Sequence, residues 1–357
     1  MASLRQIVPV LAVLGCASAV SIPVTRSHPP PPPQFNLPKS YAALGDSFAS
    51  GIGSGLFLNN SADKADVECL RQDGSYPSQL LELGPFDGEP TFQFTACAGD
   101  ELDDIDGQVA KLGHSKFDLL TLTIGGNDFG FSDIATTCVY ATTQTPGIKD
   151  FQKACDAAFD IGFAKIADQA NWDKYAQKLA LVKKSLNPGG RLFVTNYPKF
   201  FAQPQVGDVC DSISFFPIPQ FAALNMTAQN RLRANDLTEK INKGIKRTVL
   251  STSGPEVRLV DFDKIFEGKR FCEPANDNDP IGANNPNVFF NDLTTVLAVP
   301  GIAKIEKQTP GLTGVDITDQ LQQVSTNHPK AGAHRVLAAG LNFRILLDSF
   351  LPVQKED

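Results

Sequence analysis

Short apolar runs alternate with longer amphipathic stretches along the chain from about residue 40 onward. The runs consist mainly of apolar or β-branched residues and end in turn-forming residues: Tyr41–Leu44, Thr91–Thr95, Leu119–Ile124, Leu192–Thr195 and Val257–Val260. Apolar runs of this length are typical of strands that are buried on both faces of a parallel sheet. We therefore predict parallel strands at these positions.

The stretches between the runs carry helical signals. Lys174–Leu186 is followed by Asn187-Pro188-Gly189-Gly190, which is a strong helix C-terminal signal. One apolar stripe recurs every four residues, as on an amphipathic helix: Leu237, Ile241, Ile245 and Val249. Ala331–Leu347 has the pattern of a closing helix. Alternation of strands and helices predicts a doubly wound α/β domain.

Residues 272–327 are irregular and rich in Asn, Asp, Pro and Gly. A connection of this length is often a lid or a binding loop. It contains Asn276-Asp277-Asn278-Asp279, whose side chains could bind calcium. We favour a solvated loop, because the spacing is not that of an EF-hand, and we predict no metal site.

Three polar or flexible turns follow three successive predicted strands. Ser47 lies in Gly45-Asp46-Ser47-Phe48, Gly99 follows the second strand, and Asn127 follows the third after two glycines. Each is an ordinary turn residue when taken alone. The carboxyl ends of parallel strands converge on one crevice, however, so the set predicts a nucleophilic serine beside two hydrogen-bond donors.

A general base is found by elimination among the four histidines. His28 lies in a proline-rich segment, and His114 precedes the third strand and so lies on the wrong side of the sheet. His334 falls inside the closing helix, whereas His328 precedes Pro329 in a loop from which an imidazole can project. We favour His328 over His334.

Composition narrows the class of protein. The 357 residues are 42% hydrophobic and 20% charged, which is ordinary for a globular chain with a sizeable core. The net charge of −7, without clusters of Lys and Arg, argues against a nucleic-acid partner.

The N-terminal residues 1–19 have the pattern of a secretory signal peptide: Arg5, the apolar run Ile7–Leu14, and the small residues Ala17-Ser18-Ala19. The alternative is a buried helix. Residues 20–38 are a linker whose prolines, Pro29 to Pro33, form a spacer rather than a ligand for a proline-binding domain. No later run is long enough to span a membrane. We therefore predict a secreted, extracellular protein.

Cysteine usage agrees with export, because an even number of cysteines remains after the signal: Cys69, Cys97, Cys138, Cys155, Cys210 and Cys272. Such a count favours disulfides. Metal binding is the weaker interpretation, since no C-x-x-C pair occurs and histidines are few. Asn59 and Asn225 begin glycosylation sequons, which matter only in a eukaryotic host.

Taken in order, these blocks resemble the SGNH, or GDSL, hydrolase family and its secreted lipase and esterase branch. Tyr41–Ser47 is similar to the nucleophile block, with GDSF in place of GDSL, and Ala96–Gly99, Gly125–Asp128 and His328-Pro329 resemble the later blocks. The resemblance implies a flavodoxin-like three-layer α/β/α sandwich with a mostly parallel sheet over 39–351, which leaves 352–357 as a tail.

The same resemblance implies roles for individual residues. Ser47 would be the nucleophile and His328 the base, while the oxyanion hole would consist of the Ser47 N–H, the Gly99 N–H and the Asn127 amide. Sequential cysteine pairing is usual in this branch, which implies Cys69–Cys97, Cys138–Cys155 and Cys210–Cys272.

One position departs from the family pattern. An aspartate usually lies three residues before the histidine, but here that position is Ser325. The acid normally orients the imidazole. We expect the main-chain carbonyl of Ser325 to do so, with Asp319 and Asp292 as weaker candidates.

The sequence therefore predicts a monomeric, cofactor-independent serine hydrolase that cleaves small-molecule, lipid or acylated-glycan esters. A carbohydrate deacetylase and an inactive secreted binding protein are the alternatives. Gly51–Gly55 is expected to form a flexible pocket wall, and the pairs Phe215-Phe216 and Phe289-Phe290 are expected at the pocket mouth.

Overall fold

The computed structural model describes residues 36–58, 64–139, 150–205, 207–213, 225–252, 254–276, 278–282, 285–291 and 327–350. The predicted signal peptide, most of the linker and the C-terminal tail lie outside these residues. So do several single positions singled out above: Asn59, Phe215, Phe216, Asp292, Asp319 and Ser325.

A five-stranded parallel sheet forms the centre of the fold, with the order β2-β1-β3-β4-β5. The strands are β1 (Ser40–Gly45), β2 (Thr91–Phe94), β3 (Phe117–Thr123), β4 (Leu186–Thr195) and β5 (Val257–Val260). Each predicted strand is confirmed. In β1 and β3 nearly every residue is buried, because helices cover both faces of the sheet.

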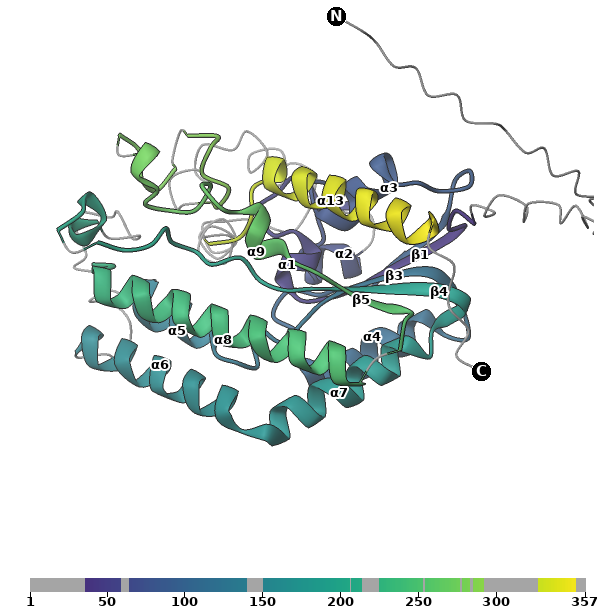
Figure 1. The fold of residues 1–357 in the computed structure, drawn as a ribbon, viewed down its shortest axis with the longest axis horizontal. Coiled ribbons are helices and arrows are strands. Elements are labelled where there is room, and N and C mark those ends of the chain that lie inside the picture. Colours follow the sequence, from purple (N-terminus) through teal and green to yellow (C-terminus); the bar gives the residue numbers. More distant parts are fainter. Residues whose placement is uncertain are drawn as a thin grey trace, which may run out of the picture. The chain divides into compact units, whose positions relative to one another are not determined.

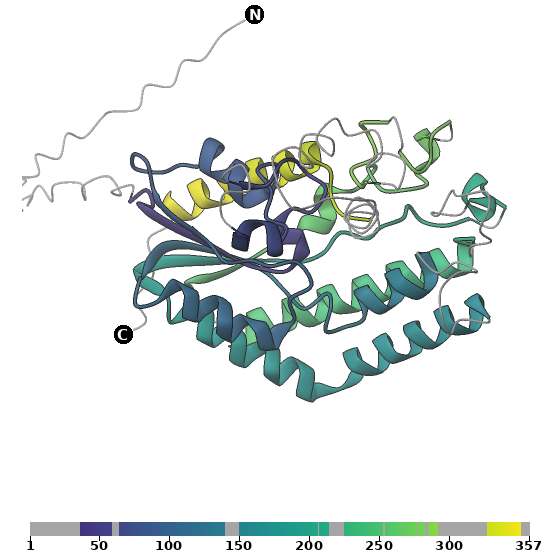
Figure 2. The same ribbon diagram turned by 180° about the vertical axis from the view of Figure 1, so that it is seen from behind.

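Helices cover the sheet on two sides (Figures 1 and 2). One layer contains α1 (Ser47–Ser50), α2 (Lys64–Glu68), α3 (Tyr76–Leu83), α9 (Phe262–Ile265) and α13 (Ala331–Phe350). The opposite layer contains α4 (Ile105–Leu112), α5 (Phe131–Ile134), α6 (Phe151–Ala167), α7 (Gln169–Lys183) and α8 (Ala228–Thr252). This confirms the three-layer α/β/α sandwich. Short turns of 3₁₀ or π helix complete the description: η2 (Leu102–Asp104), η3 (Ala135–Val139), η4 (Val209–Ser212) and η5 (Pro274–Asn276).

Two helix predictions hold and one is partly wrong. The apolar stripe of four residues lies on α8 and is buried, and the closing helix is α13. The helix predicted to end at Leu186 ends instead at Lys183, and Leu186 begins β4. Leu186 pairs with Phe117 across a register shift, so the Asn-Pro-Gly-Gly segment bends the start of a strand rather than capping a helix.

The strand order reverses at β1, which lies between β2 and β3. Ligands of open α/β sheets bind outside the carboxyl ends of the strands at such a point. None of the helices in the described ranges is long and apolar enough to cross a membrane.

Candidate active site

The turn after β1 places Ser47 at the start of a short helix. Gly45 has φ +136°, and a Cβ there would lie 2.1 Å from the Thr123 carbonyl oxygen, so only glycine fits. Asp46 is the N-cap of α1, and its side chain accepts a hydrogen bond from the Phe48 N–H at 3.0 Å. Ser47 is consequently held half-buried at the carboxyl end of β1.

His328 lies directly against the serine. Its Nε2 is 2.7 Å from Ser47 Oγ, and its ring packs on Phe48 with centroids 5.1 Å apart. The other candidate, His334, is fully buried on α13, where its Nδ1 accepts a hydrogen bond from the Tyr76 N–H. Burial lowers the pKa of His334 from 6.5 to about 3, so this imidazole stays neutral and is part of the buried core.

Gly99 and Asn127 lie on the wall of the same cavity as Ser47. Gly99 has φ +86°, and within the described residues neither its N–H nor that of Ser47 donates a hydrogen bond. Asn127 is fixed at both ends of its amide: Oδ1 accepts from Ser132 Oγ at 2.7 Å, and Nδ2 donates to the Asp100 carbonyl at 3.0 Å. An amide carries two N–H hydrogens, so among the described residues one donor of Asn127, which lines the cavity, is left for a ligand.

The cavity that contains these groups has a volume of about 300 Å³ and predominantly apolar walls. Its larger apolar side chains are Phe48, Ile52, Leu70, Phe131, Val139, Phe200, Phe201 and Met226. Ile52 comes from the glycine-rich segment that was expected to form a wall. The prediction for Phe289 and Phe290 is wrong, because neither lines the cavity. Phe290 is fully buried and packs behind Phe200, with ring centroids 5.5 Å apart.

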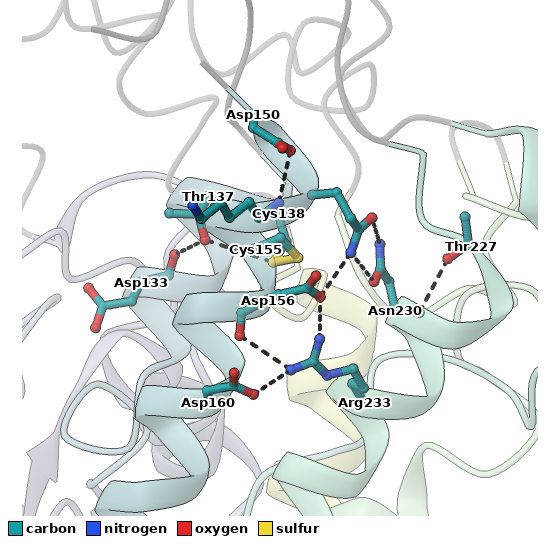
Figure 3. Close-up of a disulfide and its surroundings, with 12 residues drawn as sticks. Asp133, Thr137, Cys138, Asp150, Cys155, Asp156, Asp160, Thr227, Asn230 and Arg233 are labelled. Carbon is teal, nitrogen blue, oxygen red and sulfur yellow. Dashed lines mark hydrogen bonds and ion pairs between the residues drawn. A yellow bond between two sulfur atoms is a disulfide. The ribbon is translucent and has the colours of Figure 1, made fainter. Parts of the chain in front are cut away.

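Three disulfides connect the segments around the cavity, and they have the sequential pairing that the resemblance implied: Cys69–Cys97, Cys138–Cys155 and Cys210–Cys272. Figure 3 shows the second of them, which joins η3 to α6. The figure also shows Arg233 of α8 paired with Asp156 and Asp160 of α6. The wall that carries Val139 is therefore tied to α6, and α6 is tied to α8.

Two acidic residues of these turns were not singled out from the sequence. Burial raises the pKa of the Asp46 carboxyl to about 7, and burial raises that of Asp128 to about 6, although the Leu102 N–H donates to it. The only local signal was their position beside Ser47 and Asn127.

Other predicted site residues do not line this cavity or fall outside the described ranges. Asn225 is exposed, as a glycosylated sequon requires, whereas Asn59 lies outside the described residues. Ser325 also lies outside, so the group that orients His328 stays a prediction. Within the described ranges no group of three or more metal-ligating side chains occurs.

Known proteins are similar to this chain in sequence. Residues 43–292 match the model of the GDSL-like lipase/acylhydrolase family. A lipase from Streptomyces rimosus is 30% identical over 274 residues, which are 77% of this chain and 84% of that protein.

Solved structures show the same fold. An extracellular lipase from Streptomyces rimosus superposes with a TM-score of 0.56 at 23% identity, over 87% of this chain and 99% of that one. A phospholipase A1 from Streptomyces albidoflavus NA297 does so with a TM-score of 0.56 at 21% identity, over the same shares of the two chains. From the family match and the sequence identity together, this chain belongs to the GDSL-like lipase/acylhydrolase family of ester hydrolases.

Proposed function

We propose that Ser47 and His328 carry out the hydrolysis of a carboxylic ester whose acyl group occupies the apolar cavity. The observation that carries this proposal is the 2.7 Å contact between Ser47 Oγ and His328 Nε2 at that cavity. A serine and a histidine within hydrogen-bond reach are the minimum requirement for an activated serine nucleophile.

In the first half of the reaction, Ser47 Oγ attacks the ester carbonyl carbon while His328 Nε2 accepts the hydroxyl proton. The oxyanion then accepts hydrogen bonds from the Ser47 N–H, the Gly99 N–H and the Asn127 amide. Loss of one such donor typically costs about 3 kcal/mol of barrier. As the C–O bond breaks, His328 returns the proton to the leaving alcohol.

The second half repeats these steps with water. His328 takes a proton from the water as its oxygen attacks the acyl-enzyme, and the same donors stabilise the second oxyanion. Collapse of this intermediate breaks the bond to Ser47 Oγ, which regains its proton from the imidazolium, and releases the carboxylic acid.

The walls of the cavity favour an acyl chain of several carbons over acetyl. The volume of about 300 Å³ exceeds what an acetyl group fills, and Leu70, Val139 and Phe200 add apolar surface to the walls. Each methylene buried there is worth roughly 0.8 kcal/mol. This favours a lipase or esterase over the alternative of a carbohydrate deacetylase.

The site of action is proposed to be outside the cell, after removal of residues 1–19. The three disulfides support this, because disulfides persist in oxidising compartments. N-terminal sequencing of protein recovered from the culture medium tests it. A mature chain that begins near residue 20 is expected, and retention of Met1 would contradict the proposal.

The test of the nucleophile uses a fluorophosphonate probe, which reacts covalently with activated serines. The wild-type protein should be labelled at Ser47, and Ser47→Ala should lose both the labelling and ester hydrolysis while it remains folded. Ser78→Ala, which changes a serine of α3 away from the cavity, is the matched control. An unlabelled wild type would favour the inactive binding protein instead.

The test of the acyl group uses p-nitrophenyl esters from acetyl to decanoyl. Addition of four methylenes to acetyl should raise kcat/KM by up to about 200-fold if all four are buried. Highest activity on acetyl, with hydrolysis of acetylated xylan, would favour the deacetylase.

A further inference from the structure

The three turns that carry the proposed oxyanion donors are linked to one another by hydrogen bonds. Gln108 connects the first turn to the second: its Oε1 accepts from the Gly45 N–H at 2.8 Å, and its Nε2 donates to Asp100 Oδ2 at 2.6 Å. The Asn127 amide connects the third turn to the second through the Asp100 carbonyl.

Tyr197 supplies the remaining link, between the first turn and the third. It follows β4 and is fully buried. Its hydroxyl donates to Asp46 Oδ2 and accepts from the Gly126 N–H at 2.9 Å. One phenol oxygen therefore contacts the residue before Ser47 and the residue before Asn127.

The tyrosine is itself held in place. The Asn242 side chain accepts from the Tyr197 N–H at 3.0 Å and donates to the Tyr197 carbonyl at 2.7 Å. The rings of Phe48 and Phe131 pack edge-on against the phenol ring, with centroids 5.2 and 5.1 Å away. Little freedom remains for the hydroxyl to move away from either turn.

The direction of these hydrogen bonds follows from the groups that carry the hydrogens, because the Gly126 N–H can only donate. Burial raises the pKa of the Tyr197 hydroxyl well above 10, so it remains a protonated donor. Burial also raises the pKa of Asp46, whereas the hydrogen bond from Tyr197 opposes that rise. The chain of donors therefore runs from the Gly126 N–H through the Tyr197 hydroxyl to Asp46.

We propose that Tyr197 is a positioning residue, whose hydroxyl sets the Asn127 amide at its distance from the Ser47 N–H. The proposal rests on the oxyanion roles that are proposed above for those two groups. Tyr197 does not line the cavity, so it acts through the two turns and not by contact with the substrate.

The first test compares Tyr197→Phe with Tyr175→Phe. Both remove only a buried hydroxyl, but within the described residues the Tyr175 hydroxyl has no hydrogen-bond partner. Because small displacements of oxyanion donors cost about 10²-fold, Tyr197→Phe should lower kcat about 10- to 100-fold and change KM less than about 3-fold. Tyr175→Phe should leave kcat within about 2-fold of wild type.

The second test combines Tyr197→Phe with Asn127→Ala. If the hydroxyl acts by positioning the Asn127 amide, Tyr197→Phe should lower kcat by at most about 3-fold in the Asn127→Ala background, because the effects of coupled residues are non-additive. A structural role alone would lower the melting temperature without this dependence on Asn127.

Two outcomes would overturn this inference and leave the proposed oxyanion roles intact. One is an unchanged kcat in Tyr197→Phe, and the other is a full, additive loss of kcat in the Asn127→Ala background. Full activity of the single Asn127→Ala variant would instead refute the oxyanion role proposed for Asn127, and the inference with it. The two failures are therefore distinguishable.

Discussion

Asn291 and His328 are joined through their main chains. The Asn291 N–H donates to the His328 carbonyl at 2.8 Å, and the Asn327 N–H donates to the Asn291 carbonyl at 3.0 Å. The Asn291 side chain is also buried, and its Nδ2 donates to the Gly53 carbonyl at 3.2 Å. The loop that carries the proposed base is thus tied to the segment that follows the proposed nucleophile.

Removal of the Asn291 side chain should therefore loosen the alignment of His328 with Ser47. Asn291→Ala keeps the main-chain pair but loses the bond to Gly53, so we expect kcat to fall about 10-fold, with a stability loss of about 1 kcal/mol. Asn287→Ala, at an exposed position of the same segment, should change neither quantity. Steady-state kinetics measures kcat, and urea unfolding measures stability. An unchanged kcat in Asn291→Ala would show that this hydrogen bond does not help to align His328 with Ser47.

Loss of the Cys138–Cys155 disulfide should impair the hydrolysis of esters with long acyl chains more than that of esters with short ones. It joins η3 to α6 (Figure 3), and η3 supplies Ala135, Thr136 and Val139 to the cavity wall. With both cysteines changed to serine, we expect hydrolysis of decanoyl esters to fall about 10-fold relative to butanoyl esters. The butanoyl ester is the internal control. Equal loss on the two esters would contradict a role confined to the wall.

His334 should make the fold sensitive to acid. Its pKa is about 3 in the fold against 6.5 when exposed, so between these values the unfolded chain binds a proton that the native state does not. Stability is thereby lost as pH falls from 6.5 toward 3, at up to about 1.4 kcal/mol per pH unit. The raised pKa of Asp46 acts in the opposite direction, since there the native state binds the proton first.

His334→Asn separates the two effects. The Asn side chain retains an acceptor for the Tyr76 N–H but does not titrate, so the difference in unfolding free energy between wild type and variant should shrink or reverse as pH falls from 7 to 4.5. His114→Asn, at an exposed histidine, should leave the slope unchanged. Urea unfolding across this pH range provides the measurement. A parallel pH dependence of wild type and His334→Asn would show that this histidine is not kept neutral.

Most of the fold was predictable, because a strand that is buried on both faces must be apolar along its length. The start of β4 was not, because the Asn-Pro-Gly-Gly signal is local whereas the pairing of Leu186 with Phe117 spans the sheet. Tertiary pairing overrides local preference at such a position.

The sequence pointed to the candidate site residues that lie in characteristic turns. It did not point to the residues that hold those turns in place. Tyr197 lies 151 residues from Asp46 in sequence, and no pattern around it indicates a shared hydrogen bond. Similarly, the Phe289-Phe290 pair is apolar, but composition does not distinguish the lining of a cavity from the layer behind it. Phe290 belongs to that second layer.

The orientation of His328 gives the last prediction, since Ser325 stands where the family usually has aspartate. If the main-chain carbonyl of Ser325 accepts the Nδ1 hydrogen, its side chain is not needed, and Ser325→Ala should keep most of the activity. His328→Ala should lose nearly all of it, because the serine proton then has no acceptor. Asp319→Asn and Asp292→Asn should have small effects, whereas loss of a true triad acid lowers kcat about 10⁴-fold. Steady-state kinetics on a soluble ester separates these cases. A loss of that size in either aspartate variant, with folding unchanged, would identify a carboxylate as the orienting group.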